Sequence, residues 1–174
     1  MSTAYKATFA DRFGASELET FRSVHRGPCL TPGSEGYDDA RTIWNATIDK
    51  WPLVIAQPMG VADVMACVAF ARDKGLPLAI KAGGHNVAGN ALVDDGLVID
   101  LCRMRSVRVD ARTRRAWVGG GCTLGDVDRE TQVYGLAAPL GVVSQTGVAG
   151  LTLHGGLGYL RRKHGMACDA VRSF

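Results

Sequence analysis

The stretch Lys81-Ala82-Gly83-Gly84-His85-Asn86 directly follows the apolar run Leu78-Ala79-Ile80, which predicts a buried strand. Two consecutive glycines at the end of a strand let backbone N–H groups turn toward a ligand with no side chain in the way, as in loops that hold phosphate groups. His85 would then lie beside the bound group. Gly-Gly after a strand also occurs in simple tight turns, so both interpretations stay open for this stretch alone.

The residues before this stretch predict a βαβ unit. Leu53-Val54-Ile55-Ala56 is a continuous apolar run, which favours a strand buried on both faces as in a parallel sheet. Between the two strands, Gly75 marks the end of a helix whose apolar residues recur at helical spacing, at Val61, Val64, Met65 and Val68. The crossover should be right-handed, and Gly83-Gly84-His85 would lie at the carboxyl end of the second strand, where open α/β sheets bind ligands.

The residues after this stretch predict antiparallel structure. Leu97-Val98-Ile99-Asp100-Leu101 predicts a third strand, and residues 107–118 alternate as a hairpin around a polar turn. Thr123 and Asp126 resemble a capping box at the start of a helix that ends at Gly135. Its inner face would be formed by Leu124, Val127, Thr131 and Tyr134. The predicted fold class is therefore α+β, with a small parallel βαβ subdomain followed by a mixed or antiparallel subdomain.

A second glycine-rich segment lies between Gly141 and Gly165. Its glycines are interleaved with Val, Leu and Thr, at positions Gly141, Gly147, Gly150, Gly155, Gly156, Gly158 and Gly165. A flexible linker would contain Ser and Pro instead. The composition predicts backbone packed closely against a large flat molecule or against other backbone.

Composition and charge narrow the class of protein. The chain has 174 residues, 47% of them hydrophobic, which suffices for the core of a soluble globular protein. Its net charge of +3 comes from scattered arginines, so a solvated basic face is favoured over a nucleic-acid interface. No stretch is apolar enough for a membrane span, and residues 1–10 lack a secretory signal, so we expect a cytoplasmic protein without membrane contact.

The remaining motifs exclude several kinds of site. Five widely spaced cysteines without a Cys-x-x-Cys pair favour free thiols, mostly packed inside, over disulfides or zinc ligands. The four histidines match no zinc pattern, so no metal is expected. Gly155-Gly156-Leu157-Gly158 lacks a third glycine at Arg161, and neither a P-loop nor a nucleophile elbow occurs.

The two glycine-rich segments together resemble a known family. Residues 81–86 with Gly89-Asn90, and residues 146–165, look like the FAD-linked oxidases of the vanillyl-alcohol oxidase and berberine-bridge-enzyme type, which share a PCMH-type FAD-binding domain. The resemblance covers the chain from about Tyr37 to its last residue. It implies an incomplete PCMH-type domain over residues 37–174. The residue pattern itself predicts a short helix over Ser16 to Val24 and a loop in residues 1–36, and a second short helix within Tyr37 to Trp44.

The resemblance also implies a cofactor, FAD, and the residues that hold it. In this family the Gly-Gly-His loop wraps the FAD pyrophosphate, and the histidine that matches His85 is joined to the 8α-methyl group of the flavin. The alternative is a hydrogen-bonded His85 beside noncovalent FAD. Some relatives carry a second link from a cysteine at the position of Val143, so a single link is implied here. The implied cofactor-binding residues are Lys81, Ala82, Gly83, Gly84, His85, Asn86, Gly89, Asn90, Gly141, Val142, Val143, Ser144, Thr146, Gly147, Gly150 and Leu151.

The sequence departs from the family at Ala170, where relatives often have asparagine, and in length. Relatives continue into a substrate domain with the catalytic base, so we expect no catalytic residue here and interpret the chain as a fragment, a truncated product or one piece of a longer polypeptide. The implied activity is hydride transfer from a small alcohol, sugar or secondary metabolite to FAD, with dioxygen reduced to hydrogen peroxide. The alternative is a noncatalytic flavin- or nucleotide-binding remnant. Unpaired sheet edges would promote self-association.

Overall fold

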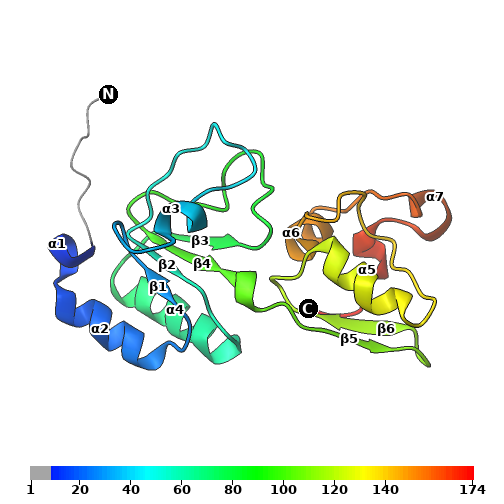
Figure 1. Ribbon diagram of the computed structural model, residues 1–174, viewed down its shortest axis with the longest axis horizontal. Helices are drawn as coiled ribbons and strands as arrows, with labels where there is room; N and C mark the ends of the chain where they lie inside the picture. Colours follow the sequence, from blue (N-terminus) through cyan, green and yellow to red (C-terminus); the bar gives the residue numbers. More distant parts are fainter. Residues whose placement is uncertain (1–8) are drawn as a thin grey trace. The chain divides into compact units, whose positions relative to one another are not determined.

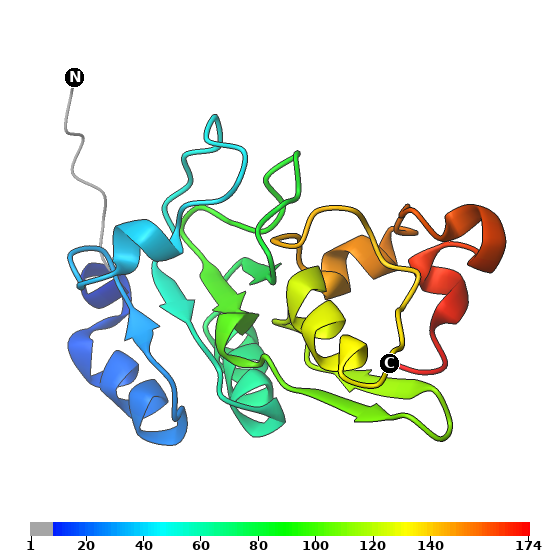
Figure 2. The same ribbon diagram turned by 45° about the vertical axis from the view of Figure 1, so that its right-hand side comes forward.

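The computed structural model describes residues 9–174, which divide into two compact units (Figures 1 and 2). The first unit contains the described residues up to Lys81 together with Val87–Asp100. The second contains Ala82–Asn86 and Leu101–Phe174. The Gly-Gly-His stretch therefore belongs to the second unit, although the strand that leads into it belongs to the first. The boundary expected between residues 36 and 37 stays a prediction.

A four-stranded sheet forms the centre of the first unit. Its order is β1 (Cys29–Leu30), β2 (Val54–Ala56), β4 (Leu97–Asp100) and β3 (Leu78–Lys81). β4 pairs in parallel with both β2 and β3, whereas β1 is antiparallel to β2. The strands expected for the βαβ unit are thus parallel, as predicted, but β4 lies between them.

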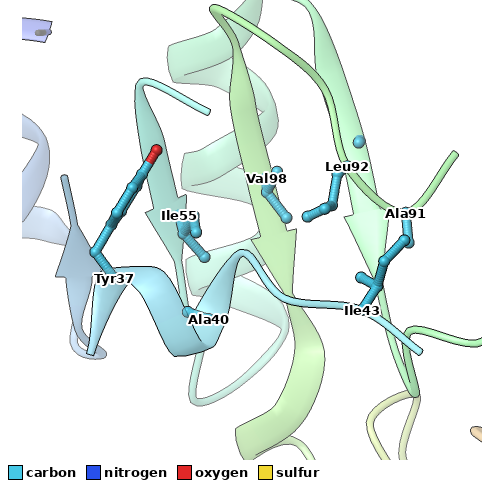
Figure 3. Close-up of a cluster of buried hydrophobic side chains, with 8 residues drawn as sticks. Tyr37, Ala40, Ile43, Ile55, Ala91, Leu92 and Val98 are labelled. Carbon is cyan, nitrogen blue, oxygen red and sulfur yellow. The ribbon is translucent and has the colours of Figure 1, made fainter. Parts of the chain in front are cut away.

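The core of this unit lies on both faces of β2 and β4, which are buried along their whole length. On one face, the short helix α3 (Tyr37–Ala40) and the following loop contribute to a cluster of buried apolar side chains, with α4 (Val61–Asp73) on the other face (Figure 3). α2 (Ala15–Val24) packs against α4. The Tyr37 hydroxyl donates a 2.6 Å hydrogen bond to the Pro52 carbonyl oxygen, and burial raises the pKa of Tyr37 to about 12.

Helix α4 is confirmed, but its buried face is not the one that the apolar spacing indicated. Val61, Met65 and Val68 are exposed, whereas Cys67 and Ala71 are buried against the sheet side. Small side chains let the helix approach the sheet closely, so the larger apolar residues point away. The apolar residues Val61, Met65 and Val68 therefore lie on the surface of the unit.

The burial expected for β3 is also wrong. Only Ala79 is buried, while Leu78 and Ile80 on the opposite side of the strand are 40% and 58% exposed. β3 forms one edge of the sheet and pairs only with β4. A continuous apolar run fits an edge strand as well as a central one, and the position in the sheet decides between them.

The second unit is built on the predicted hairpin. β5 (Val107–Asp110) pairs antiparallel with β6 (Arg115–Val118), and α5 (Leu124–Gln132) packs against β5. The capping box of Thr123 and Asp126 is present at the start of α5. Three of the four residues predicted for its inner face are buried, and Tyr134 is exposed. The remaining elements are α6 (Val148–Leu153), α7 (Arg161–His164) and the 3-10 helices η1 (Leu101–Arg103) and η2 (Ala167–Ala170).

Helix α1 (Phe9–Phe13) precedes α2. No helix within residues 9–174 has both the length and the apolar character needed to cross a bilayer. All five cysteines are free thiols, and Cys67 and Cys122 are buried. Within the same residues no group of three or more His, Cys, Asp or Glu side chains is arranged to hold a metal ion.

Candidate flavin-binding site

The loop that carries His85 packs its backbone against the second glycine-rich segment. A Cβ atom at Gly83 would lie only 2.6 Å from Cα of Gly147, and one at Gly147 would lie 2.8 Å from Cα of Gly83. Real Cβ atoms do not approach so closely, so neither position accepts a side chain without moving backbone. The structure thus brings together the two segments that the sequence singled out, at a distance of about 60 residues along the chain.

Gly84 requires glycine for a different reason. Its φ is +68°, in the left-handed region that L side chains rarely adopt, and the residue is buried. The turn at Gly84 directs the chain into His85, which is half-buried. The loop therefore presents one imidazole next to a turn of bare backbone.

The segment around Gly147 is held by the start of α5. Gly147 forms an antiparallel bridge with Thr123, flanked by 2.9 Å hydrogen bonds from Val148 N to Cys122 O and from Leu124 N to Thr146 O. A further 2.9 Å bond joins Gly125 N to Ser144 O. The second unit therefore stacks three stretches of backbone in a row: the start of α5, residues 144–148 and the Gly83 loop.

The capping box fixes this start of α5 electrostatically. Asp126 accepts hydrogen bonds from Thr123 N at 2.8 Å and from the Arg105 guanidinium at 2.6 and 2.9 Å. The bond from Arg105 is the main reason that the pKa of Asp126 falls to about 2. Asp126 is thus ionised across the physiological range, and the backbone stack is anchored on a charged pair.

The other predicted residues of the second unit fall into two groups. Gly141 and Gly156 receive the Leu151 side chain, whose Cδ1 and Cδ2 atoms would each lie 2.5 Å from a Cβ at those positions. Leu151 therefore has a packing role. By contrast, residues 142–145 are exposed, and a Cβ at Gly150 would meet no atom within 4 Å. Gly150 and residues 142–145 are therefore exposed, and the described residues of this chain do not cover them.

Three predicted residues belong to the first unit. The Lys81 ammonium donates to Ala40 O at 2.6 Å and pairs with Asp100. Gly89 is buried with φ +75°, and a Cβ there would lie 2.8 Å from the Ile48 side chain. Asn90 is exposed. Gly89 and Lys81 thus each have a structural role inside their own unit.

Sequence reasoning missed the residues that support the loop after Asn86. Asn45 Nδ2 donates to Val87 O at 2.8 Å, and Lys50 Nζ donates to Gly89 O and Leu92 O, both at 3.0 Å. These contacts join residues about 40 positions apart, and no local pattern signals them. Asp100 was missed as well, although a charged residue that ends a buried strand opposite Lys81 was a usable signal.

The donor set of the second unit fits a dinucleotide cofactor better than a metal or a catalytic triad. It has exposed glycine backbone at Gly150, a half-buried glycine at Gly83 and a single half-buried imidazole at His85. Backbone free of Cβ atoms allows a phosphate or a flat ring to approach closely. At Gly150 a Cβ atom would lie in open space, so the space beside this glycine is free for a ligand.

Comparison with known proteins supports this assignment. Residues 52–174 match the family described as FAD binding domain. Among characterised proteins, (R)-6-hydroxynicotine oxidase of Paenarthrobacter nicotinovorans is 38% identical over 157 residues, which cover 90% of this chain and 34% of that protein.

Two solved structures show the same fold. The wild-type berberine-bridge-enzyme-like protein 1 of Physcomitrella patens superposes with a TM-score of 0.83 at 28% identity, covering 87% of this chain and 34% of that one. Phl p 4, a grass pollen allergen with glucose dehydrogenase activity, gives a TM-score of 0.81 at 30% identity, covering 88% of this chain and 34% of that one. The chain thus spans about a third of the length of these relatives.

Proposed function

This chain belongs to the FAD binding domain family of FAD-linked oxidoreductases, with the PCMH-type fold of the berberine-bridge-enzyme-like proteins, and on that premise we propose that it is the FAD-holding part of an oxidase. The observation that carries the proposal is the contact of Gly83 with Gly147, because it joins the two glycine-rich segments into one surface of bare backbone. FAD itself would accept a hydride from a small alcohol, sugar or secondary metabolite and pass two electrons to dioxygen, giving hydrogen peroxide.

The residues proposed to hold FAD are those of the two segments. The turn at Gly83 and Gly84 carries no Cβ atoms, and its backbone N–H groups would bind phosphate oxygens. Residues 141–150 would lie along the ring system and its side chain, where Gly150 leaves open space and Val142 and Val143 expose apolar surface. Asn86 would complete the phosphate side within the second unit. The proposal that Lys81, Gly89 and Asn90 of the first unit also contact FAD rests on the resemblance of the sequence alone.

His85 is proposed to attach FAD covalently. A neutral imidazole nitrogen is a competent nucleophile toward the electron-poor 8α-methyl carbon. The attachment replaces one methyl hydrogen by the imidazole nitrogen, an oxidation by two electrons that dioxygen can take up. Val143 offers no thiol for a second link, so a single attachment is expected. In a noncovalent variant of this proposal, His85 would only donate or accept a hydrogen bond beside the ring.

The substrate is set outside the residues described here. One relative is named for the oxidation of 6-hydroxynicotine and another for the dehydrogenation of glucose, yet both match this chain over most of its length. A part shared by two such different activities supplies the flavin site and leaves the choice of substrate to other residues. The catalytic base is accordingly proposed to lie outside this chain, and self-association to occur through the exposed strand edge. The proposal places no nucleic acid among the partners and locates the protein in the cytoplasm.

Acid precipitation tests the proposal directly. Protein produced with FAD available should show a flavin absorption spectrum and keep its yellow colour in the acid pellet, whereas His85→Ala should release the colour into the supernatant. A colourless pellet from the unmutated chain, together with a flavin spectrum before precipitation, would replace covalent by noncovalent binding. No flavin spectrum at all would overturn the proposed function.

The competing function is a flavin-binding remnant without oxidase chemistry. Steady peroxide production with a candidate alcohol or sugar by the protein that contains this chain distinguishes the two. The remnant should bind flavin and release no peroxide above the substrate-free rate.

A further inference from the structure

Lys81 and Asp100 occupy a special place in the chain path. They are register partners at the carboxyl ends of the parallel strands β3 and β4. Each is also the last residue of the first unit before the chain enters the second, because Ala82 and Leu101 begin the two main segments of that unit. The pair therefore lies at the carboxyl ends of β3 and β4, where the chain passes from the sheet into the second unit.

The two side chains form a buried ion pair with a third contact. Lys81 Nζ lies 3.4 Å from Asp100 Oδ2 and donates a 2.6 Å hydrogen bond to Ala40 O at the end of α3. The side chains are 12% and 2% exposed. Fixing the ammonium between a carboxylate and a carbonyl oxygen determines the direction in which the Lys81 side chain leaves its backbone.

Stability alone does not account for such a pair. The cost of taking two charges out of water offsets much of their attraction, so a pair of apolar side chains in the same place is often as stable. The other carboxylate buried to the same degree, Asp63, has a local role, because it accepts Met59 N at the start of α4 as well as the Arg26 guanidinium. Asp100 directly precedes η1, whereas Lys81 begins no helix, and the property that the two residues share is their place at the exits from the sheet.

We propose that the Lys81–Asp100 ion pair positions the His85 loop, so that Lys81 serves the flavin site through the path of the backbone and not through its ammonium. The expected effect on flavin attachment rests on the proposed function, whereas the positioning of the His85 loop does not. Lys81 lies four residues before His85 and two before Gly83. A small change in the direction of Lys81 therefore moves Gly83 on Gly147 and displaces the imidazole, and covalent reactions are steeply sensitive to such displacement.

The test uses the double variant Lys81→Met/Asp100→Leu, which removes both charges without leaving one buried alone. Its matched control is Arg26→Met/Asp63→Leu, which removes the other buried carboxylate of the same unit. The readout in the cofactor-free chain is the nuclear Overhauser effect between the α protons of Gly83 and Gly147. The effect between the α protons of Thr123 and Gly147, a non-hydrogen-bonded antiparallel pair, serves as the internal reference.

We expect the Gly83–Gly147 effect, relative to the reference, to fall at least threefold in Lys81→Met/Asp100→Leu. It should stay within a factor of 1.5 in the control, roughly the scatter of such intensities, and Lys81→Arg should retain at least half of it because its guanidinium keeps the charge and the donors. An unchanged ratio in the double variant, an equal fall in the control, or an equal fall in Lys81→Arg would each overturn the positioning role.

A second readout links the pair to the flavin. Covalently retained flavin after acid precipitation should fall at least fivefold in the double variant and less than twofold in the control. Equal retention in the two would overturn the consequence for His85. If the unmutated chain holds no flavin at all, the proposed function fails, while the proton measurement still decides whether the ion pair positions the loop.

Discussion

The sheet of the first unit and the glycine contact of the second unit show two kinds of close packing. In the sheet, β2 and β4 bury branched side chains such as Ile55 and Val98 against the layers on either side. In the second unit, Gly83 and Gly147 bring backbone directly onto backbone. A side-chain core tolerates some change of shape because neighbouring side chains can shift. A contact between two backbones can adjust only if the chain itself moves. The second kind of packing leaves a surface that a large cofactor can use.

The largest effect is expected where the backbones touch. Gly147→Ala should destabilise the second unit by roughly 4 kcal/mol, at the high end for single substitutions, because the new Cβ overlaps Gly83 backbone, which would have to shift. Gly150→Ala is the matched control, since its Cβ meets open space inside α6, where alanine is the better helix former by up to about 1 kcal/mol. Urea unfolding measures both, and equal losses would contradict the comparison.

The side-chain core should yield a somewhat smaller loss. Ile55→Ala removes a fully buried side chain from the cluster in Figure 3 and should cost about 3 kcal/mol, part of it for the cavity that remains. Ile55→Val is the graded control at about 1 kcal/mol. Calorimetric unfolding gives the values, and a loss below about 1 kcal/mol for Ile55→Ala would show that the core can collapse around the gap.

Each unit also has a carboxylate at the third residue of a helix that is hydrogen-bonded to an arginine, Asp63 in α4 and Asp126 in α5. The pKa of each falls to about 2, chiefly through a hydrogen bond from an arginine. Because the folded pKa is depressed, the stabilisation is complete above the ordinary carboxylate pKa near 4 and is lost as the pH falls toward 2.

For Asp126 we expect a contribution of about 1 kcal/mol, reduced from the full linkage value because half of Arg105 is exposed. Urea unfolding at pH values from 7 down to 3 should show this loss in the unmutated chain. Asp126→Asn should flatten that part of the profile. A steeper profile in the variant would contradict the assigned pKa.

The smallest effect on stability is expected at the exposed edge strand. Ile80→Lys should change the free energy of unfolding by less than about 0.5 kcal/mol because Ile80 is exposed. It should nevertheless raise the monomer fraction in size-exclusion chromatography, since a lysine on an edge strand opposes strand pairing between copies. An unchanged elution profile of an associating chain would locate the association elsewhere.

Local patterns predicted most of the elements. The apolar run of β2, the hairpin of β5 and β6, and the capping box at Thr123 are each determined within a few residues, so the sequence sufficed. The buried face of α4 and the exposure of β3 depend on which elements lie beside them. Asp63 illustrates the limit, because the guanidinium that pairs with its buried carboxylate comes from Arg26, 37 residues away.

The candidate site was predicted in part for the same reason. Two glycine-rich segments marked Gly83 and Gly147, and the structure brings them into contact. Leu151 proved to pack among glycines, and the Lys81 side chain to bind Asp100 and Ala40, which only the three-dimensional path of the chain reveals. The flavin-binding role of these residues stays a proposal.

The most direct test of flavin binding by the second unit is the shift in melting temperature that FAD causes, measured side by side for the unmutated chain and Gly150→Ala. A ligand that binds only the folded state raises the melting temperature by an amount that grows with the logarithm of its affinity. We expect a clear rise for the unmutated chain and a smaller rise for Gly150→Ala, although that variant should melt no lower without FAD. No rise in the unmutated chain, or the same rise in both, would contradict the claim that the open glycine surface of the second unit receives the flavin.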